Sequence, residues 1–249
     1  MAAPIKTISI YVRIVRTYAN HAPSLLLLAT VVFVPLGLLD AIAVNVEAGP
    51  LSPSNGLLTA AAAGAVVLLA LTGLIGEVFY SGAVAVSLTH AARGRTAPLH
   101  EIARRLNYRR LITVDLLYGA IVVVGLLLLV VPGVAAFVLF GLSGPVVEIE
   151  GRSVGGALRR SRELVRGRFW TVLLVLGPIE LVGDLLTDLL TGLVHHHLGH
   201  SLLGIWTAES LSNIVLTPIY AVAAVLLTLD LIVEKDGAPP RLHSATDHA

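Results

Sequence analysis

The sequence contains no cysteine and few charged residues. Without cysteine, the 249-residue chain can form no disulfide, no thiolate metal site and no cysteine nucleophile. Charged residues make up only 13% of the chain, whereas hydrophobic residues make up 56% and the mean hydropathy is +0.87. A soluble domain of this length needs more charge to cover its surface, so the composition predicts an integral membrane protein.

The sequence motifs of common enzyme classes are absent too. The only lysines are Lys6 and Lys235, and neither follows a glycine-rich turn, so a phosphate-binding loop is excluded. A G-x-S-x-G nucleophile elbow and an H-E-x-x-H zinc motif do not occur. We therefore expect no enzymatic activity, no cofactor and no nucleic-acid partner.

Six apolar stretches meet or approach the roughly 20 residues that a helix needs to cross a bilayer. They are 24–44, 57–80, 111–131, 134–149, 169–194 and 211–233. Backbone polar groups must satisfy one another inside lipid, so we expect these stretches to be helical. A turn at Pro132–Gly133 joins the third to the fourth. The second continues without proline to about residue 92, so its inner end is expected to project beyond the bilayer.

The lysines and arginines fall into four clusters. These are Lys6, Arg13 and Arg16; Arg93, Arg95, Arg104, Arg105, Arg109 and Arg110; Arg152, Arg159, Arg160, Arg162, Arg166 and Arg168; and Lys235 with Arg241. The alternate connections, 45–56, 132–133 and 195–210, contain none. Because positively charged loops stay in the cytoplasm, the pattern predicts three helical hairpins with both termini cytoplasmic, in a bacterial-type plasma (inner) membrane. We expect one membrane domain over 1–237 and a disordered cytoplasmic tail over 238–249.

The basic stretches that precede the hairpins are expected to form amphipathic surface helices over 5–18, 97–110 and 153–168. In the last of these, Ser153 is a suitable N-cap. Apolar or small residues recur at helical spacing on one face: Val154, Ala157, Leu158, Ser161, Leu164 and Val165. The remaining faces carry the arginines that we expect to contact anionic lipid headgroups, at about 1 kcal/mol each: Arg159, Arg160, Arg162 and Arg166. The alternative is that these charges serve topology and anchoring alone.

Residues 132–175 carry a further pattern. It consists of a PG turn, a helix that ends in P-V-V-x-x-E-G, and an A-L-R-R-S-x-x-L-x-x-G-x-x-W segment that leads into the next span. The matching residues are Pro145, Val146, Val147, Gly151, Ala157, Leu158, Arg159, Arg160, Ser161, Leu164, Gly167 and Trp170. This pattern resembles that of the glycerophosphoryl diester phosphodiesterase membrane-domain family, and residues 217–237 resemble the closing segment of the same family.

The resemblance implies a membrane module. In some members this module is fused to a catalytic phosphodiesterase barrel, which takes about 250 residues. Only 16 residues follow Val233 here, so the resemblance implies no phosphodiesterase activity for this chain.

Three acidic residues lie inside the fifth predicted span. Glu180, Asp184 and Asp188 are spaced i, i+4 and i+8, which places them within about 80° of one face of a helix. Charged residues inside a span are costly and are candidates for function. One interpretation is a path for cations or protons, and the other is a wet groove between helices. Glu77 is a further acidic candidate whose depth depends on where the second helix enters the membrane.

A histidine-rich stretch follows, with His195, His196, His197 and His200. If the helix continued, His196 and His200 could share a metal ion with Asp188. The alternative is a solvated histidine cluster that senses pH. Two other acids, Asp115 and Asp230, are expected to be interfacial anchors near Arg110 and Lys235.

These observations favour a non-enzymatic membrane protein, a scaffold or accessory module that contacts anionic lipids and, as a further expectation, a protein partner. The alternative is a small transporter or channel that uses the acidic stripe of the fifth span.

Overall fold

The computed structural model describes residues 7–48, 80–88, 106–198 and 202–237. Within these ranges the chain is helical apart from short turns, and no strand occurs in them. Five helices of the described residues are long and apolar enough to cross a membrane: Ile8–Leu38, Tyr108–Leu128, Val130–Glu150, Phe169–Val194 and Trp206–Asp236. The prediction of an all-α protein with several such helices is confirmed. Residues 57–79 of the predicted second span lie outside the described residues. Residues 97–105 of the predicted surface helix 97–110 also lie outside them.

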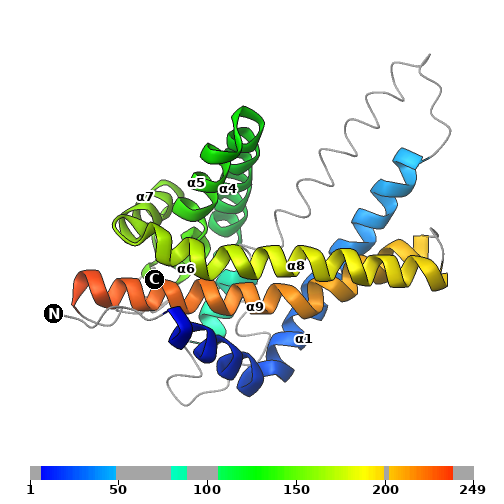
Figure 1. The fold of residues 1–249 in the computed structure, drawn as a ribbon, viewed down its shortest axis with the longest axis horizontal. Helices are drawn as coiled ribbons and strands as arrows, with labels where there is room; N and C mark the ends of the chain where they lie inside the picture. The colour runs from blue at the N-terminus through cyan, green and yellow to red at the C-terminus, as the bar shows by residue number, and fades with distance from the viewer. Residues whose placement is uncertain (1–6, 49–79, 89–105, 199–201, 238–249) are drawn as a thin grey trace.

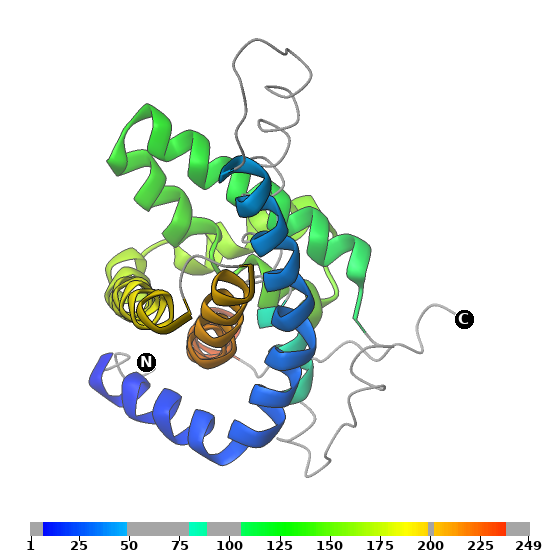
Figure 2. The ribbon, with the colours of Figure 1, turned by 90° about the vertical axis from the view of Figure 1, so that its right-hand side faces the viewer.

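The N-terminal helix, α1 (Thr7–Ala48), is a single element where the sequence predicted two. The predicted surface helix 5–18 and span 24–44 are joined without interruption through Pro23. A proline inside a helix removes one backbone hydrogen bond and crowds the preceding turn. Helix α1 changes direction in its first half, as Figure 2 shows in blue. Pro23 therefore bends the helix instead of ending it.

A short helical segment, 80–88, packs against α1. Its first residue, Tyr80, is fully buried and donates a hydrogen bond to the carbonyl oxygen of Leu25 at 2.6 Å. The Tyr80 ring also contacts Phe33, with ring centroids 5.5 Å apart. Buried tyrosines commonly find such a hydrogen-bond partner, so this contact fixes the segment on α1.

Helices α4 (Tyr108–Leu128) and α5 (Val130–Phe140) pack against each other after a sharp break at Leu129, which is extended. The predicted turn at Pro132–Gly133 is therefore misplaced. Pro132 instead lies in the first turn of α5, where its missing N–H leaves no helical hydrogen bond unmade. Gly133 lies against Gly125, and a Cβ atom on Gly125 would be only 2.9 Å from the Cα of Gly133. The two glycines thus let the helices approach closely.

The predicted span 134–149 consists of two helices. After a break at Gly141 and Leu142, the chain continues as α6 (Ser143–Glu150), which is almost entirely buried. Gly151 ends α6 in a left-handed conformation, with φ at 65°. A residue with a side chain would be strained there, whereas glycine is not.

The predicted fifth and sixth spans correspond to α8 (Phe169–Leu198) and α9 (Leu202–Asp236), which lie side by side and antiparallel in Figure 1. Helix α9 is the central element of the described structure, because α1 and α8 both pack along it. Residues 220–228 of α9 are consequently all buried.

A hydrogen bond connects α1 to α8 next to Pro178. A proline cannot donate to the carbonyl four residues before it, which leaves the Leu174 carbonyl oxygen without its usual helical partner. The Tyr11 hydroxyl of α1 donates to this oxygen at 2.6 Å. The proline inside the predicted fifth span is thus accommodated by a side chain from the N-terminal helix.

The α4–α5 pair runs crosswise to the α8–α9 pair in Figure 1 and does not extend it as one parallel bundle. Between these two pairs lies α7 (Val154–Val165), which contacts α4, α5, α6 and α9. This helix carries three of the six arginines of the third basic cluster, Arg159, Arg160 and Arg162, and Arg166 is its C-cap.

Candidate functional site

Helix α7 forms where the sequence predicted a surface helix over 153–168. The Ser153 hydroxyl accepts a hydrogen bond from the backbone N–H of Gly156, which confirms Ser153 as the N-cap. At the other end, Gly167 turns the chain with φ at 90°. The Lys235 ammonium of α9 donates to the carbonyl oxygens of Glu163 and Arg166, the latter at 3.0 Å. A cation that binds the last carbonyls of a helix also complements its dipole, so both ends of α7 are stabilised.

The predicted apolar face of α7 is the face that the structure buries. Its buried residues are Ala157, Leu158, Ser161, Leu164 and Val165. The Ser161 hydroxyl donates to the Leu139 carbonyl oxygen at 2.7 Å, near the end of α5 where helical donors run out. This face contacts protein, so only the arginine-bearing side of α7 remains for lipid.

One of the four predicted lipid-binding arginines lies instead in a network of ion pairs. Arg160 is only 11% exposed and binds Glu150 of α6, with 3.0 Å between Nε and Oε1, and Asp236 of α9. Burial lowers the pKa of the Arg160 guanidinium, but hydrogen bonds and charge from Glu150 and Asp236 outweigh it, so the net shift is upward. Arg168 similarly binds Glu234 at 2.9 Å. These arginines fasten α7 and the start of α8 to the last turn of α9.

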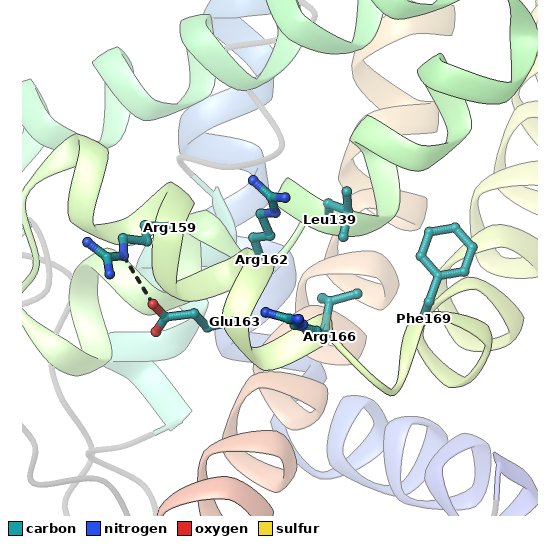
Figure 3. A pocket seen from close by; sticks show the side chains of 7 residues that line it. Leu139, Arg159, Arg162, Glu163, Arg166 and Phe169 are labelled. Atoms are coloured by element: carbon teal, nitrogen blue, oxygen red, sulfur yellow. Dashed lines mark hydrogen bonds and ion pairs between the residues drawn. The ribbon is translucent and has the colours of Figure 1, made fainter.

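The other three arginines line a cavity of about 580 Å³, which we call the basic pocket. Its lining residues are Leu139, Arg159, Arg162, Glu163, Val165, Arg166 and Phe169. Figure 3 shows the charged side chains on α7 and at its C-terminal end, together with Leu139 from α5 and Phe169 from α8. Arg159 binds Glu163 at 3.1 Å, whereas no carboxylate of the described residues pairs with Arg162 or Arg166.

The composition of the basic pocket suits an amphipathic anion. Three guanidinium groups face one carboxylate, which leaves a surplus of two positive charges beside apolar side chains. Guanidinium groups bind phosphate oxygens in a bidentate manner. Phe169 is the first residue of the candidate span Phe169–Val194. The neighbouring Trp170 is 70% exposed, and its indole contacts the Phe169 ring edge-on. Tryptophan is typical of the membrane interface.

Other basic residues lie at the same end of the α8–α9 pair. Arg13 of α1 binds both carboxylate oxygens of Asp230, at 2.7 and 3.0 Å. The expected neighbour of Asp230, Lys235, instead caps α7. Arg110 donates to the Gly151 carbonyl oxygen at 3.2 Å. Basic clusters that are far apart in the sequence are thus brought together. Sequence reasoning did not identify the acids that bind them, because these acids are distant along the chain.

The acidic stripe of α8 is separate from the basic pocket. Glu180 is half-buried, and Asp184 and Asp188 are exposed. A cavity of about 290 Å³ that lies beside this part of α8 is lined by Tyr11, Pro178, Ile179, Val182, Gly183, Leu186, Leu216 and Ile219. The structure therefore places the acids along one helix without bringing them into that cavity. Glu77 lies outside the described residues.

No group of three or more histidine, aspartate or glutamate residues is placed to hold a metal ion within the part of the chain that the structure describes. Asp188 and His196 are both exposed on α8, and His200 falls outside the described ranges. Asp115 is fully buried in α4, and its predicted role as an interfacial anchor near Arg110 stays a prediction.

No protein-family model, curated protein or solved structure matches this chain. The resemblance to the phosphodiesterase membrane-domain family stays a prediction. The structure does give the residues of its pattern a physical role: Gly151 and Gly167 have positive φ, Ser161 binds an exposed carbonyl of α5, and Arg160 joins three helices. These positions serve the docking of α7.

Proposed function

We propose that this chain is a non-enzymatic, multi-pass membrane protein that binds anionic lipid in the basic pocket and serves as a scaffold or accessory module. It would cross a bacterial-type inner membrane six times with both termini in the cytoplasm. The observation that carries the proposal is that Arg162 and Arg166, which no described carboxylate neutralises, line the same pocket as the apolar side chains of Leu139 and Phe169. Phe169 is also the first residue of a candidate span.

The physical basis of binding is the attraction of arginine for phosphate next to a surface that accepts hydrocarbon. A basic residue near an anionic membrane surface contributes about 1 kcal/mol. Arg160 and Arg168 cannot contribute in this way while their charges are matched by Glu150, Asp236 and Glu234. The resemblance to a family of membrane modules agrees with a non-catalytic role.

The test uses the full-length protein in nanodiscs and measures the lipid retained around it by native mass spectrometry. Discs that contain phosphatidylcholine and phosphatidylglycerol should yield protein enriched in phosphatidylglycerol. The double variant Arg162→Ala/Arg166→Ala should lose about 2 kcal/mol of that preference, or roughly 30-fold.

A matched control is Arg16→Ala/Arg109→Ala, which removes two exposed arginines that do not line the basic pocket. It should retain most of the preference. Equal losses in both double variants would mean that the positive charges act through topology and anchoring alone, and the proposed pocket would have to be abandoned.

A further inference from the structure

We propose that the basic pocket selects lipids with a phosphomonoester headgroup, such as phosphatidic acid, over lipids with a phosphodiester headgroup, such as phosphatidylglycerol. This inference rests on the proposed lipid-binding function and names the ligand class that the pocket takes.

The first argument is the number of charges. Among the described residues, Arg162 and Arg166 are the guanidinium groups of the pocket that no carboxylate neutralises. A phosphomonoester carries between one and a half and two negative charges near pH 7, because its second pKa is about 6. A phosphodiester carries a single negative charge. The monoester therefore matches the surplus charge of the pocket, whereas the diester leaves one guanidinium without an anion.

The second argument is the number of oxygens that can accept hydrogen bonds. Arg159 and Arg162 lie three residues apart on α7 and project from neighbouring turns, and Arg166 directly follows the last residue of this helix. A phosphomonoester offers three terminal oxygens to these side chains, and a phosphodiester offers two. Arg159 is bound to Glu163 at 3.1 Å, but both side chains are exposed, at 84% and 49%. Exposed ion pairs of this spacing are weak, so a headgroup oxygen can replace the Glu163 carboxylate on Arg159.

The third argument identifies a lipid, and not a soluble phosphate, as the source of the headgroup. Leu139, Val165 and Phe169 form apolar walls of the pocket, and Phe169 begins the candidate span. Inorganic phosphate makes no use of such walls. The glycerol backbone and the first methylene groups of an anchored lipid can cover them, which favours a ligand that is already in the membrane.

The pH dependence of binding follows from the ligand. The charged side chains that face the pocket are Arg159, Arg162, Glu163 and Arg166, with Lys235 approaching the end of α7 from α9. None of these is histidine, the side chain that ordinarily changes charge between pH 5 and 8. A phosphomonoester loses most of its second charge when the pH falls from 7.5 to 5.5. The preference for it should therefore decrease over this range, while phosphodiester binding should not change.

The experiment is a competition between phosphatidic acid and phosphatidylglycerol for the full-length protein in nanodiscs, read by native mass spectrometry at pH 7.5 and pH 5.5. We expect a preference for phosphatidic acid of roughly fivefold at pH 7.5 and near parity at pH 5.5. Glu163→Gln removes the competing carboxylate and should strengthen phosphatidic acid binding about threefold. Arg162→Lys/Arg166→Lys keeps the charge but loses the bidentate geometry, and should retain only part of the preference.

The outcomes separate this inference from the proposed function. If both anionic lipids are enriched equally, and Arg162→Ala/Arg166→Ala abolishes the enrichment, lipid binding stands and the selectivity is wrong. If neither lipid is enriched over phosphatidylcholine, the proposed function itself fails. If millimolar inorganic phosphate displaces phosphatidic acid completely, the pocket is a soluble-anion site and the commitment to a lipid is overturned.

Discussion

At one end of the α8–α9 pair, Arg160 and Arg168 bind acids in the last turn of α9. Just past the middle of α8, toward the other end, Asp184 and Asp188 are exposed, and no cation of the described residues pairs with them. The two ends thus use the same residue types in opposite ways. Glu234 and Asp236 neutralise arginines that hold helices together. Asp184 and Asp188 form no ion pair within the described residues.

This difference shows where charge is structural and where it is available for function. Arg160 and Arg159 are adjacent in the sequence, yet the first is almost buried between two carboxylates and the second is on the open side of the same helix. An arginine-rich motif alone does not distinguish the two roles. The role of each arginine depends on which carboxylates lie within reach of its guanidinium group and on how deeply the pair is buried.

The largest expected effect concerns the side of the membrane on which each end lies. The chain is free of cysteine, so single cysteines can be introduced without other changes. In intact cells, a membrane-impermeant maleimide should label His196→Cys but should label Ser153→Cys only after permeabilisation, because positive segments stay in the cytoplasm. Labelling of both from the same side would contradict the six-span topology.

A third cysteine sharpens this comparison. Leu129, at the break between α4 and α5, is 69% exposed. If α4 and α5 both cross the membrane, Leu129→Cys should be labelled together with His196→Cys. Labelling of Leu129→Cys from neither side would instead indicate that the α4–α5 pair, which runs crosswise to α8–α9, ends within the bilayer.

The next effect concerns the ion-pair network at the basic end. Arg160→Ala leaves Glu150 with reduced compensation in a largely buried position. Loss of one partner from a buried pair is strongly destabilising, and we expect the free energy of unfolding to fall by about 3 kcal/mol. Arg159→Ala is the matched control and should cost less than about 0.5 kcal/mol, because its pair is exposed. Denaturant unfolding in detergent micelles, followed by tryptophan fluorescence, measures both, and equal effects would show that the network adds little.

The smallest effect is expected for the exposed acids Asp184 and Asp188 of α8. Asp184→Asn/Asp188→Asn should change the free energy of unfolding by less than about 0.5 kcal/mol, since both side chains are exposed in the described structure. The same double variant should leave proton and cation flux into proteoliposomes unchanged. A clear loss of flux with normal folding would favour the alternative of a small transporter or channel over a lipid-binding scaffold.

Local patterns predicted much of the fold. The apolar lengths located α4 and α8 to within a few residues and the C-terminal end of α9 to within three, although α9 begins nine residues before the predicted span. The period of α7 identified its buried face, and Ser153 was identified as its N-cap. Such features depend on residues within one or two turns of each other. The break at Leu129 was not predicted, because proline is accommodated in the first turn of a helix as well as in a turn. The passage of α1 through Pro23 was not predicted, because a proline can bend a helix without ending it.

The candidate site was predicted only in part. Sequence placed Arg159, Arg162 and Arg166 on an exposed face of a basic helix, but it could not supply Leu139 and Phe169 as walls of a pocket with them. It also assigned Arg160 to lipid, whereas Glu150 and Asp236 enclose it. A lipid role for the three pocket arginines remains a prediction.

The sequence by itself determined that this chain forms helices long and apolar enough to cross a membrane and that its cations gather in a few segments, because apolar length and charge distribution are properties of the chain alone. The tertiary structure decided which of those cations are neutralised. That outcome depends on carboxylates up to 217 residues away, such as Asp230 against Arg13. Only the packing of α1, α7 and α8 against the end of α9 brings those groups within reach of one another.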